Sequence, residues 1–149
     1  MMRRVLVGIA AFFSFASIAS TASAGPDLVP IPSRLAHGVV SVRNAGDAVA
    51  GPSVVTINCH KPGMAGGCVD IPAAFAPNYT NPAYPNRLVV NVPRLLRGHV
   101  FNHTLPFWAA MVWPSGTYNF DFVVDAGGTV PEGVVGEGNN TGTYVKIVP

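Results

Sequence analysis

Residues 116–124 read Gly-Thr-Tyr-Asn-Phe-Asp-Phe-Val-Val, and this stretch decides the fold class. Large apolar side chains occupy every second position, namely Tyr118, Phe120, Phe122 and Val124. The positions between them, from Thr117 to Asp121, are polar. Alternation of this kind is typical of a strand that buries one face of an antiparallel sheet and exposes the other. We therefore expect these four side chains to point into a core.

Shorter segments with related patterns lie along the rest of the chain. They are residues 27–31, 39–43, 53–59, 88–92, 101–107 and 143–148. No segment shows a sustained apolar face with helical spacing. About seven short strands separated by Gly, Pro and Asn turns predict an all-β protein, an antiparallel β-sandwich of the immunoglobulin-like or fibronectin type III-like kind. A small closed barrel is the alternative that periodicity leaves open.

The first 24 residues have the three parts of a secretory signal peptide. Arg3 and Arg4 precede the apolar run Val5–Ile18, and Ala22-Ser23-Ala24 forms a small-x-small cleavage site. The run is shorter than the roughly 20 residues that a membrane-spanning helix needs. We expect cleavage after Ala24, one domain over residues 25–149 without membrane insertion, and a periplasmic or extracellular location.

The charge of the mature chain argues against a polyanionic partner. The full sequence has nine Lys and Arg against seven Asp and Glu. Because Arg3 and Arg4 belong to the leader, removing it leaves seven residues of each sign. Only Arg94 and Arg97 lie close together, so the basic stripe that nucleic acid requires is missing.

The two cysteines, Cys59 and Cys68, are predicted to form a disulfide. An exported chain meets an oxidising compartment, and the residues between them are rich in turn formers. If the cysteines were reduced, Cys59 and the adjacent His60 could bind copper or zinc instead. His99 and His103 make a poor zinc pair, since four residues of strand separate them by about 13 Å.

No sequence motif of a known catalytic site is present. The chain lacks a nucleophile elbow, a phosphate-binding glycine loop and a zinc-protease helix motif. We therefore predict that the protein is not an enzyme. A glycoside hydrolase, with Asp121 or Asp125 paired to a glutamate, is the remaining alternative.

Oxygen-bearing side chains gather near the end of the sequence. They are Asp125, Glu132, Glu137, Asn139 and Asn140. Carboxylate and amide oxygens are the ligands that calcium prefers. The same side chains are also common turn formers that bond to nearby backbone groups, and we favour this structural interpretation. We expect no cofactor, with calcium as the open alternative.

The stretch Ile71–Asn86 is the best candidate for a recognition loop. Pro72, Pro77, Pro82 and Pro85 prevent a long strand or helix, so we predict an ordered surface loop. Within it, Tyr79 and Tyr84 are the candidate interaction residues, because tyrosine is enriched in interfaces.

The order of several motifs resembles the CARDB module, a cell-adhesion-related domain found in bacteria. The motifs are Asp27-Leu28-Val29, Val42-Arg43-Asn44-Ala45-Gly46, Leu95-Leu96-Arg97-Gly98, Gly116-Thr117-Tyr118 and the closing segment from Val124-Asp125 through Glu132 and Glu137 to Asn139-Asn140-Thr141. The resemblance spans nearly all of residues 25–149 and implies an Ig-like sandwich. We expect an exported, non-catalytic binding or scaffolding module that contacts a protein or glycan through loops at one end. A calcium-stabilised or carbohydrate-binding accessory domain is the alternative.

Overall fold

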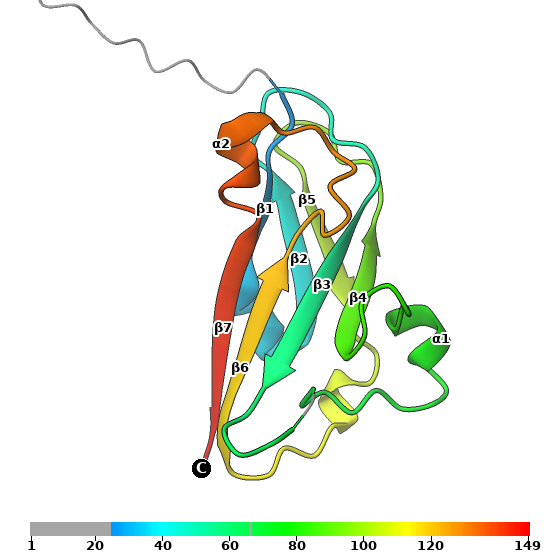
Figure 1. Cartoon of the computed structure of the whole chain (residues 1–149), viewed down its shortest axis with the longest axis vertical. Coiled ribbons are helices and arrows are strands. Elements are labelled where there is room, and N and C mark those ends of the chain that lie inside the picture. The colour runs from blue at the N-terminus through cyan, green and yellow to red at the C-terminus, as the bar shows by residue number, and fades with distance from the viewer. Residues whose placement is uncertain (1–24, 66) are drawn as a thin grey trace, which may run out of the picture.

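A computed structural model describes residues 25–65 and 67–149, so the predicted signal peptide lies outside the described residues. This part of the chain forms short strands and four short helices (Figure 1). The strands are β1 (Leu28–Pro30), β2 (Val39–Asn44), β3 (Ser53–His60), β4 (Arg87–Val92), β5 (Val100–Thr104), β6 (Gly116–Val123) and β7 (Thr141–Val148). The helices are η1 (Pro32–His37), α1 (Ala76–Tyr79), η2 (Trp108–Ala110) and α2 (Gly133–Glu137). Among the described residues, no helix has the length and apolar content to span a membrane.

The strands pair into two antiparallel sheets that form two layers. The smaller sheet has the order β1-β2-β5 and the larger one β4-β3-β6-β7. Figure 1 shows the smaller sheet behind the larger one, with the core between them. The predicted all-β sandwich is therefore confirmed, and the strands do not close into one barrel.

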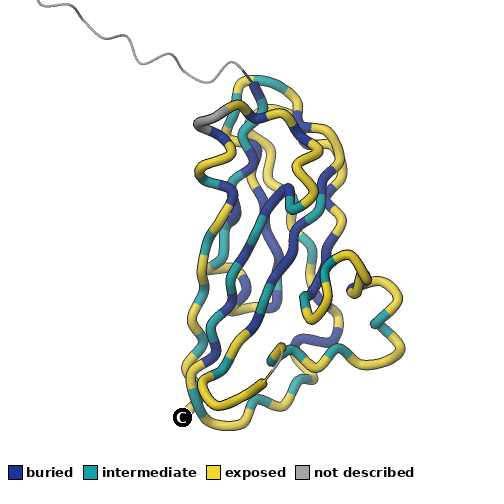
Figure 2. The backbone as a smooth tube through the Cα atoms, in the orientation of Figure 1, coloured by how far each residue is buried: buried dark blue, intermediate teal, exposed yellow. Residues whose placement is uncertain are grey.

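The core is built around the inner face of β6. Tyr118, Phe120, Phe122 and Val124 are between 0% and 3% exposed, as their alternation predicts. Figure 2 shows buried positions recurring along the strands. The rings of Trp108 and Trp113 lie 5.7 and 6.0 Å from the ring of Phe120, so the chain between β5 and β6 covers this part of the core.

Two connections between strands contain short helices. The segment Ile71–Asn86 includes α1, and the connection between β6 and β7 includes α2. Both helices are at most five residues long, so no apolar period could reveal them. Around β5, which is an edge strand, Phe101 and His103 are only half-buried, whereas Leu105 and Phe107 beyond it are buried.

Asn44 fixes the end of the sandwich where the described chain begins. Its Oδ1 accepts the backbone N–H of Asp27 at 3.2 Å and of Gly46 at 3.1 Å. Its Nδ2 donates to the carbonyls of Ala48 and Leu95 at 2.8 and 3.1 Å. The side chain is fully buried and both polar atoms have two partners, so one residue joins three segments. We call this part of the molecule the polar end.

Replacing Phe120 with Ala is expected to lower the free energy of unfolding by about 3–5 kcal/mol, because a fully buried ring leaves a cavity. Thr117→Ala, on the exposed face of the same strand, is the control and should change it by about 0.5 kcal/mol or less. Urea denaturation measures both values. Equal effects of the two substitutions would contradict the assigned faces of β6.

Candidate binding surface at the disulfide end

The predicted disulfide is present and lies at the end of β3. Cys59 is joined to Cys68, with their Cα atoms 5.0 Å apart. The amide of Cys68 also donates to the carbonyl of Cys59 at 3.1 Å. Neither cysteine is free, so a thiolate metal site with His60 has no basis here. His60 instead places its Nδ1 3.3 Å from Asp121 on the outer face of the larger sheet. We call the chain between the two cysteines the disulfide loop.

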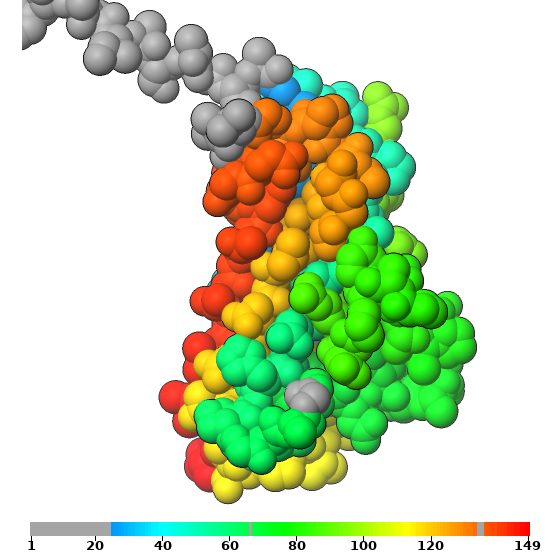
Figure 3. Space-filling view, viewed as in Figure 1, coloured from blue at the N-terminus to red at the C-terminus, as the bar shows by residue number. Residues whose placement is uncertain are grey.

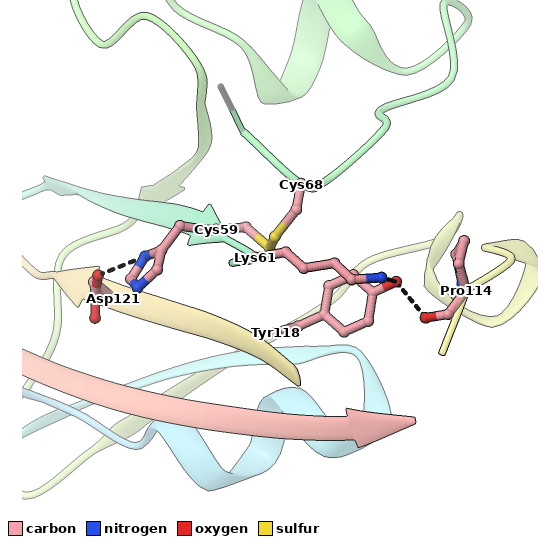
Figure 4. Close-up of a disulfide and its surroundings, with 7 residues drawn as sticks. Cys59, Lys61, Cys68, Pro114, Tyr118 and Asp121 are labelled. Carbon is pink, nitrogen blue, oxygen red and sulfur yellow. Dashed lines mark hydrogen bonds and ion pairs between the residues drawn. A yellow bond between two sulfur atoms is a disulfide. The ribbon is translucent and has the colours of Figure 1, made fainter. Parts of the chain in front are cut away.

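Lys61 anchors the start of the disulfide loop. Its ammonium lies 4.7 Å from the centre of the Tyr118 ring and donates to the carbonyl of Ser115 at 2.7 Å. The hydroxyl of Tyr118 in turn donates to the carbonyl of Pro114 at 2.6 Å. Figure 4 shows Lys61 reaching across Tyr118 beside the disulfide. These contacts hold the disulfide loop against the chain that precedes β6.

Tyr79, a predicted interaction residue, is buried in the structure, and this prediction is corrected. It is 8% exposed, its ring meets Phe107 edge-on at 5.2 Å, and its hydroxyl lies 2.9 Å from Nε2 of His103. The reason is that α1 turns this side of the segment toward β5, where Phe75 also packs on Phe107 at 5.5 Å. Tyr79 therefore anchors the Pro-rich segment Ile71–Asn86 and does not present its ring to a partner.

Tyr84, the second candidate, lines a groove between the Pro-rich segment and the disulfide loop. The groove has a volume of about 450 Å³ and extends from Cys59 and Val69 to Pro82 and Arg87. The side chain of Tyr84 is half-buried, and its amide donates to the carbonyl of Asn81 at 2.8 Å. Figure 3 shows the two bordering segments side by side on the lower part of this face.

A second hollow of about 270 Å³ lies beside the first. Asp70 and Pro72 line it on one side and Phe107, Met111 and Val112 on the other. Because Val69 and Ile71 line the first groove while Asp70 and Pro72 line the second, residues 69–72 separate the two hollows. We call the surface around both hollows the disulfide end.

The disulfide end carries few charged side chains, and those that line its hollows are Arg87 and Asp70. Asp70 is the only Asp, Glu, Lys or Arg between residues 62 and 86, and residues 98–120 contain none. Apolar side chains are nevertheless exposed there, with Val112 at 89% and Met64 at 52%. Exposed apolar side chains beside hollows, with few charges around them, are typical of an interaction surface rather than of an ordinary solvated surface.

The residues predicted as cation ligands lie near the polar end and take part in structural contacts. Oδ1 of Asp125 accepts the N–H of Thr129 at 3.1 Å and Oδ2 that of Val130 at 2.8 Å, which closes the turn after β6. Oε1 of Glu132 accepts the N–H of Leu28 at 3.1 Å and so ties the connection to β1. Nδ2 of Asn140 lies 3.5 Å from Oε2 of Glu137.

Some oxygens near the polar end are buried without a hydrogen-bond donor. They are Oδ1 of Asp27, Asn139 and Asn140. Over residues 25–65 and 67–149, no three His, Cys, Asp or Glu side chains gather closely enough to hold a metal ion. The residues predicted as cation ligands therefore contact the backbone and one another. The buried oxygens of Asp27, Asn139 and Asn140 lie in the same part of the molecule.

The sequence analysis predicted neither the two hollows nor the part of the disulfide end that residues outside the Pro-rich segment form. The prediction rested on the Pro-rich segment, whereas Val69, which precedes that segment, and Val112 also contribute. One feature of the sequence does indicate this surface. Residues 62–86 are rich in Pro and Ala and contain a single charged residue, which is unusual for a solvated surface. The pairing of that stretch with residues 107–112 depends on tertiary structure.

Comparisons with known proteins identify one similar solved structure. A scan of protein-family models and a search of curated proteins find no match. A solved structure, the CARDB domain of the PF1109 protein from Pyrococcus furiosus in complex with di-metal ions, is similar at 18% sequence identity and a TM-score of 0.43. The match covers 92% of this chain and 100% of that chain, and it bears the name of the module that the sequence resembles. The architecture described above rests on the strand pairing itself.

Glu132 makes stability depend on pH. Burial raises its pKa from 4.5 to about 7, and the nearby carboxylates of Glu137 and Asp125 add to the rise, while hydrogen bonds from Leu28 and Asn140 oppose it. The folded state therefore holds this proton more tightly than the unfolded chain does. The proton on Glu132 therefore stabilises the folded state by at most about 3 kcal/mol. This contribution to the free energy of unfolding is complete below about pH 4.5 and is lost as the pH rises to about 7.

Glu132→Gln keeps the acceptor for the N–H of Leu28 and removes the titration. Relative to this variant, the wild-type protein should lose up to about 3 kcal/mol of unfolding free energy between pH 4.5 and 7.5. Urea denaturation across that range measures the difference. Asp70→Asn, at an exposed position remote from Glu132, is the control and should follow the wild-type curve. Parallel curves for wild type and Glu132→Gln would contradict the raised pKa.

Proposed function

We propose that this chain is an exported, non-catalytic binding or scaffolding module that recognises a protein or glycan through its disulfide end. The observation that carries the proposal is the pair of hollows in a surface with one charged residue between positions 62 and 86. Interface cores are depleted in charge, and loops on a rigid scaffold commonly carry recognition.

The construction of the surface supports this proposal. The disulfide, the Lys61 contacts and the buried Tyr79 each fix one of its segments to the sandwich. A surface that is already ordered loses less conformational entropy when a partner binds. The disulfide end is therefore suited to binding in its present shape.

Two observations support export. The leader in residues 1–24 has the three parts of a secretory signal, and Cys59 and Cys68 form a disulfide, which persists in oxidising compartments. We place the protein in the periplasm or outside the cell. Asp121 and Asp125 are the carboxylates of the glycoside hydrolase alternative, and their contacts favour a non-catalytic role. Asp125 closes a turn, and Asp121 faces His60 on the outer face of the larger sheet.

A charge placed at the disulfide end tests the proposal. Val112→Asp should reduce capture of the binding partner about tenfold or more, whether the partner is found in envelope extracts or on a glycan array, because a buried charge opposes an apolar contact. Val112 is 89% exposed, so the melting temperature should stay unchanged. Leu96→Asp, at an exposed apolar position near the polar end, is the control and should bind as wild type does. Loss of capture in the Leu96 variant alone would place recognition at the other end.

A calcium-stabilised domain is the second candidate function. The buried oxygens of Asp27 and Asn140, near the Glu132 carboxylate, favour it, since calcium binds carboxylate and amide oxygens. If calcium binds there, millimolar calcium should raise the melting temperature of the wild-type protein and not that of Asn140→Ala. Magnesium is the control ion. An unchanged melting temperature in calcium would exclude this candidate.

A further inference from the structure

Strand β7 forms one edge of the larger sheet, and Figure 1 shows it along one margin of that sheet. The N–H of Val124 donates to the carbonyl of Asn140 at 2.8 Å, which fixes the phase of the ladder between β6 and β7. Every second residue of β7 therefore bonds to β6, and the residues between them direct their backbone N–H and C=O groups away from the sheet. These outward residues, which we call the outer row, are Thr141, Thr143, Val145 and Ile147. Within residues 25–65 and 67–149, no other strand or turn forms a backbone hydrogen bond with them.

The side chains of the outer row leave this edge open to a further strand. All four are β-branched and exposed, with Val145 at 50% and Ile147 at 75%. Side chains of this kind favour strand pairing. Lys146 is the only charged residue of β7, and its ammonium lies 5.5 Å from the centre of the Trp113 ring, on the core side of the strand. Charged side chains and prolines commonly block pairing at sheet edges, and the outer row has neither.

The other edges of the two sheets are shorter or flanked. Strand β1 is three residues long and ends at Pro30. Helix α1 lies against β4. Strand β5 is five residues long, and the hydroxyl of Tyr79 in α1 lies 2.9 Å from Nε2 of His103 on that strand. Strand β7, with eight residues, is therefore the edge best suited to a partner strand.

We propose that β7 pairs with β7 of a second copy of this chain, antiparallel and about a two-fold axis, so that the two larger sheets join. An antiparallel edge is its own complement, because each outward residue offers one donor and one acceptor in the order that the other copy needs. The outer row has no charge that would select a foreign strand, whereas the two-fold match requires only the chain itself.

The register of this pairing follows from the sequence of β7. With Tyr144 at the axis, Thr143 lies opposite Val145 of the other copy, and every outer-row N–H and C=O has a partner. With Lys146 at the axis, two like charges would face each other, which disfavours that register. The pairing therefore places Tyr144 at the axis.

This dimer goes beyond the proposed function and does not depend on it. Strand β7 runs from the polar end to the disulfide end, as Figure 1 shows. An antiparallel partner therefore places the two disulfide ends at opposite extremes of the dimer. One dimer can then hold two ligands apart, and binding to a ligand that carries several sites gains avidity.

Analytical ultracentrifugation of the exported protein tests the proposal. The wild-type protein should pass from monomer to dimer between about 10 μM and about 1 mM, as a small interface implies. Val145→Pro removes an N–H that makes no bond within the chain, so the melting temperature should change little. The dissociation constant of the dimer should rise about tenfold or more, because each copy loses a hydrogen bond. Val100→Pro makes the same change at an outward N–H of β5 and is the control, which should dimerise as wild type does.

A charge-swap pair identifies the partner strand without using proline. Thr143 and Val145 are exposed and lie opposite each other across the proposed axis. Replacing both with Lys, or both with Glu, should keep each variant monomeric, because like charges then face each other. An equal mixture of the two variants should form a heterodimer.

A wild-type protein that stays monomeric up to about 1 mM would overturn the proposal. A dimer that survives in Val145→Pro and in both charge variants would also overturn it. Val112→Asp should dimerise as wild type does, because Val112 lies outside β7. Loss of partner capture in that variant therefore reports on the disulfide end alone, and loss of the dimer in Val145→Pro reports on β7.

Discussion

Burial of the aromatic face of β6 is the constraint on which the rest of the structure depends. Phe120 is fully buried, and three aromatic rings, those of Trp108, Trp113 and Tyr144, lie within 6.0 Å of its centre. These rings come from the chain before β6 and from β7. The packing of these rings on Phe120 therefore determines where the connection before β6 leaves the sandwich. The connection before β6 reaches the disulfide end for this reason, and its apolar residues form one wall of the second hollow.

Parts of the structure that follow from local chemistry could be predicted from the sequence. The alternation from Tyr118 to Val124 was sufficient because a strand with a period of two can bury only one face. The disulfide followed from compartment and turn composition. Tyr79 shows the limit of such reasoning. A proline-rich context predicts a surface loop, yet the direction of one ring within it depends on Phe107, which is distant in sequence. The groove likewise needs segments that meet only in the folded chain.

The residues that carry the CARDB resemblance fix turns and strand entries. Asn44 joins three segments, and a Cβ at Gly46 would collide with the carbonyl of Gly25. Asp125 has a φ of 48° and closes the turn after β6, while Glu132 accepts the amide that opens β1. All four act on the backbone, so they determine the architecture rather than the ligand. The groove residues Val69, Ile71 and Arg87 lie outside those motifs, so the groove can vary in sequence without changing these turns.

The polar end and the disulfide end lie at opposite extremes of the long axis of the molecule. Gly25 belongs to the polar end, because its carbonyl accepts the amides of Asp47 and Ala48 next to Asn44. Figure 1 places the carboxyl end of the chain at the other extreme, near the turn between β3 and the Pro-rich segment. A surface or dye joined through residue 25 therefore leaves the hollows facing solution. The same attachment after Pro149 crowds them, so the choice of immobilisation point decides what a binding assay can detect.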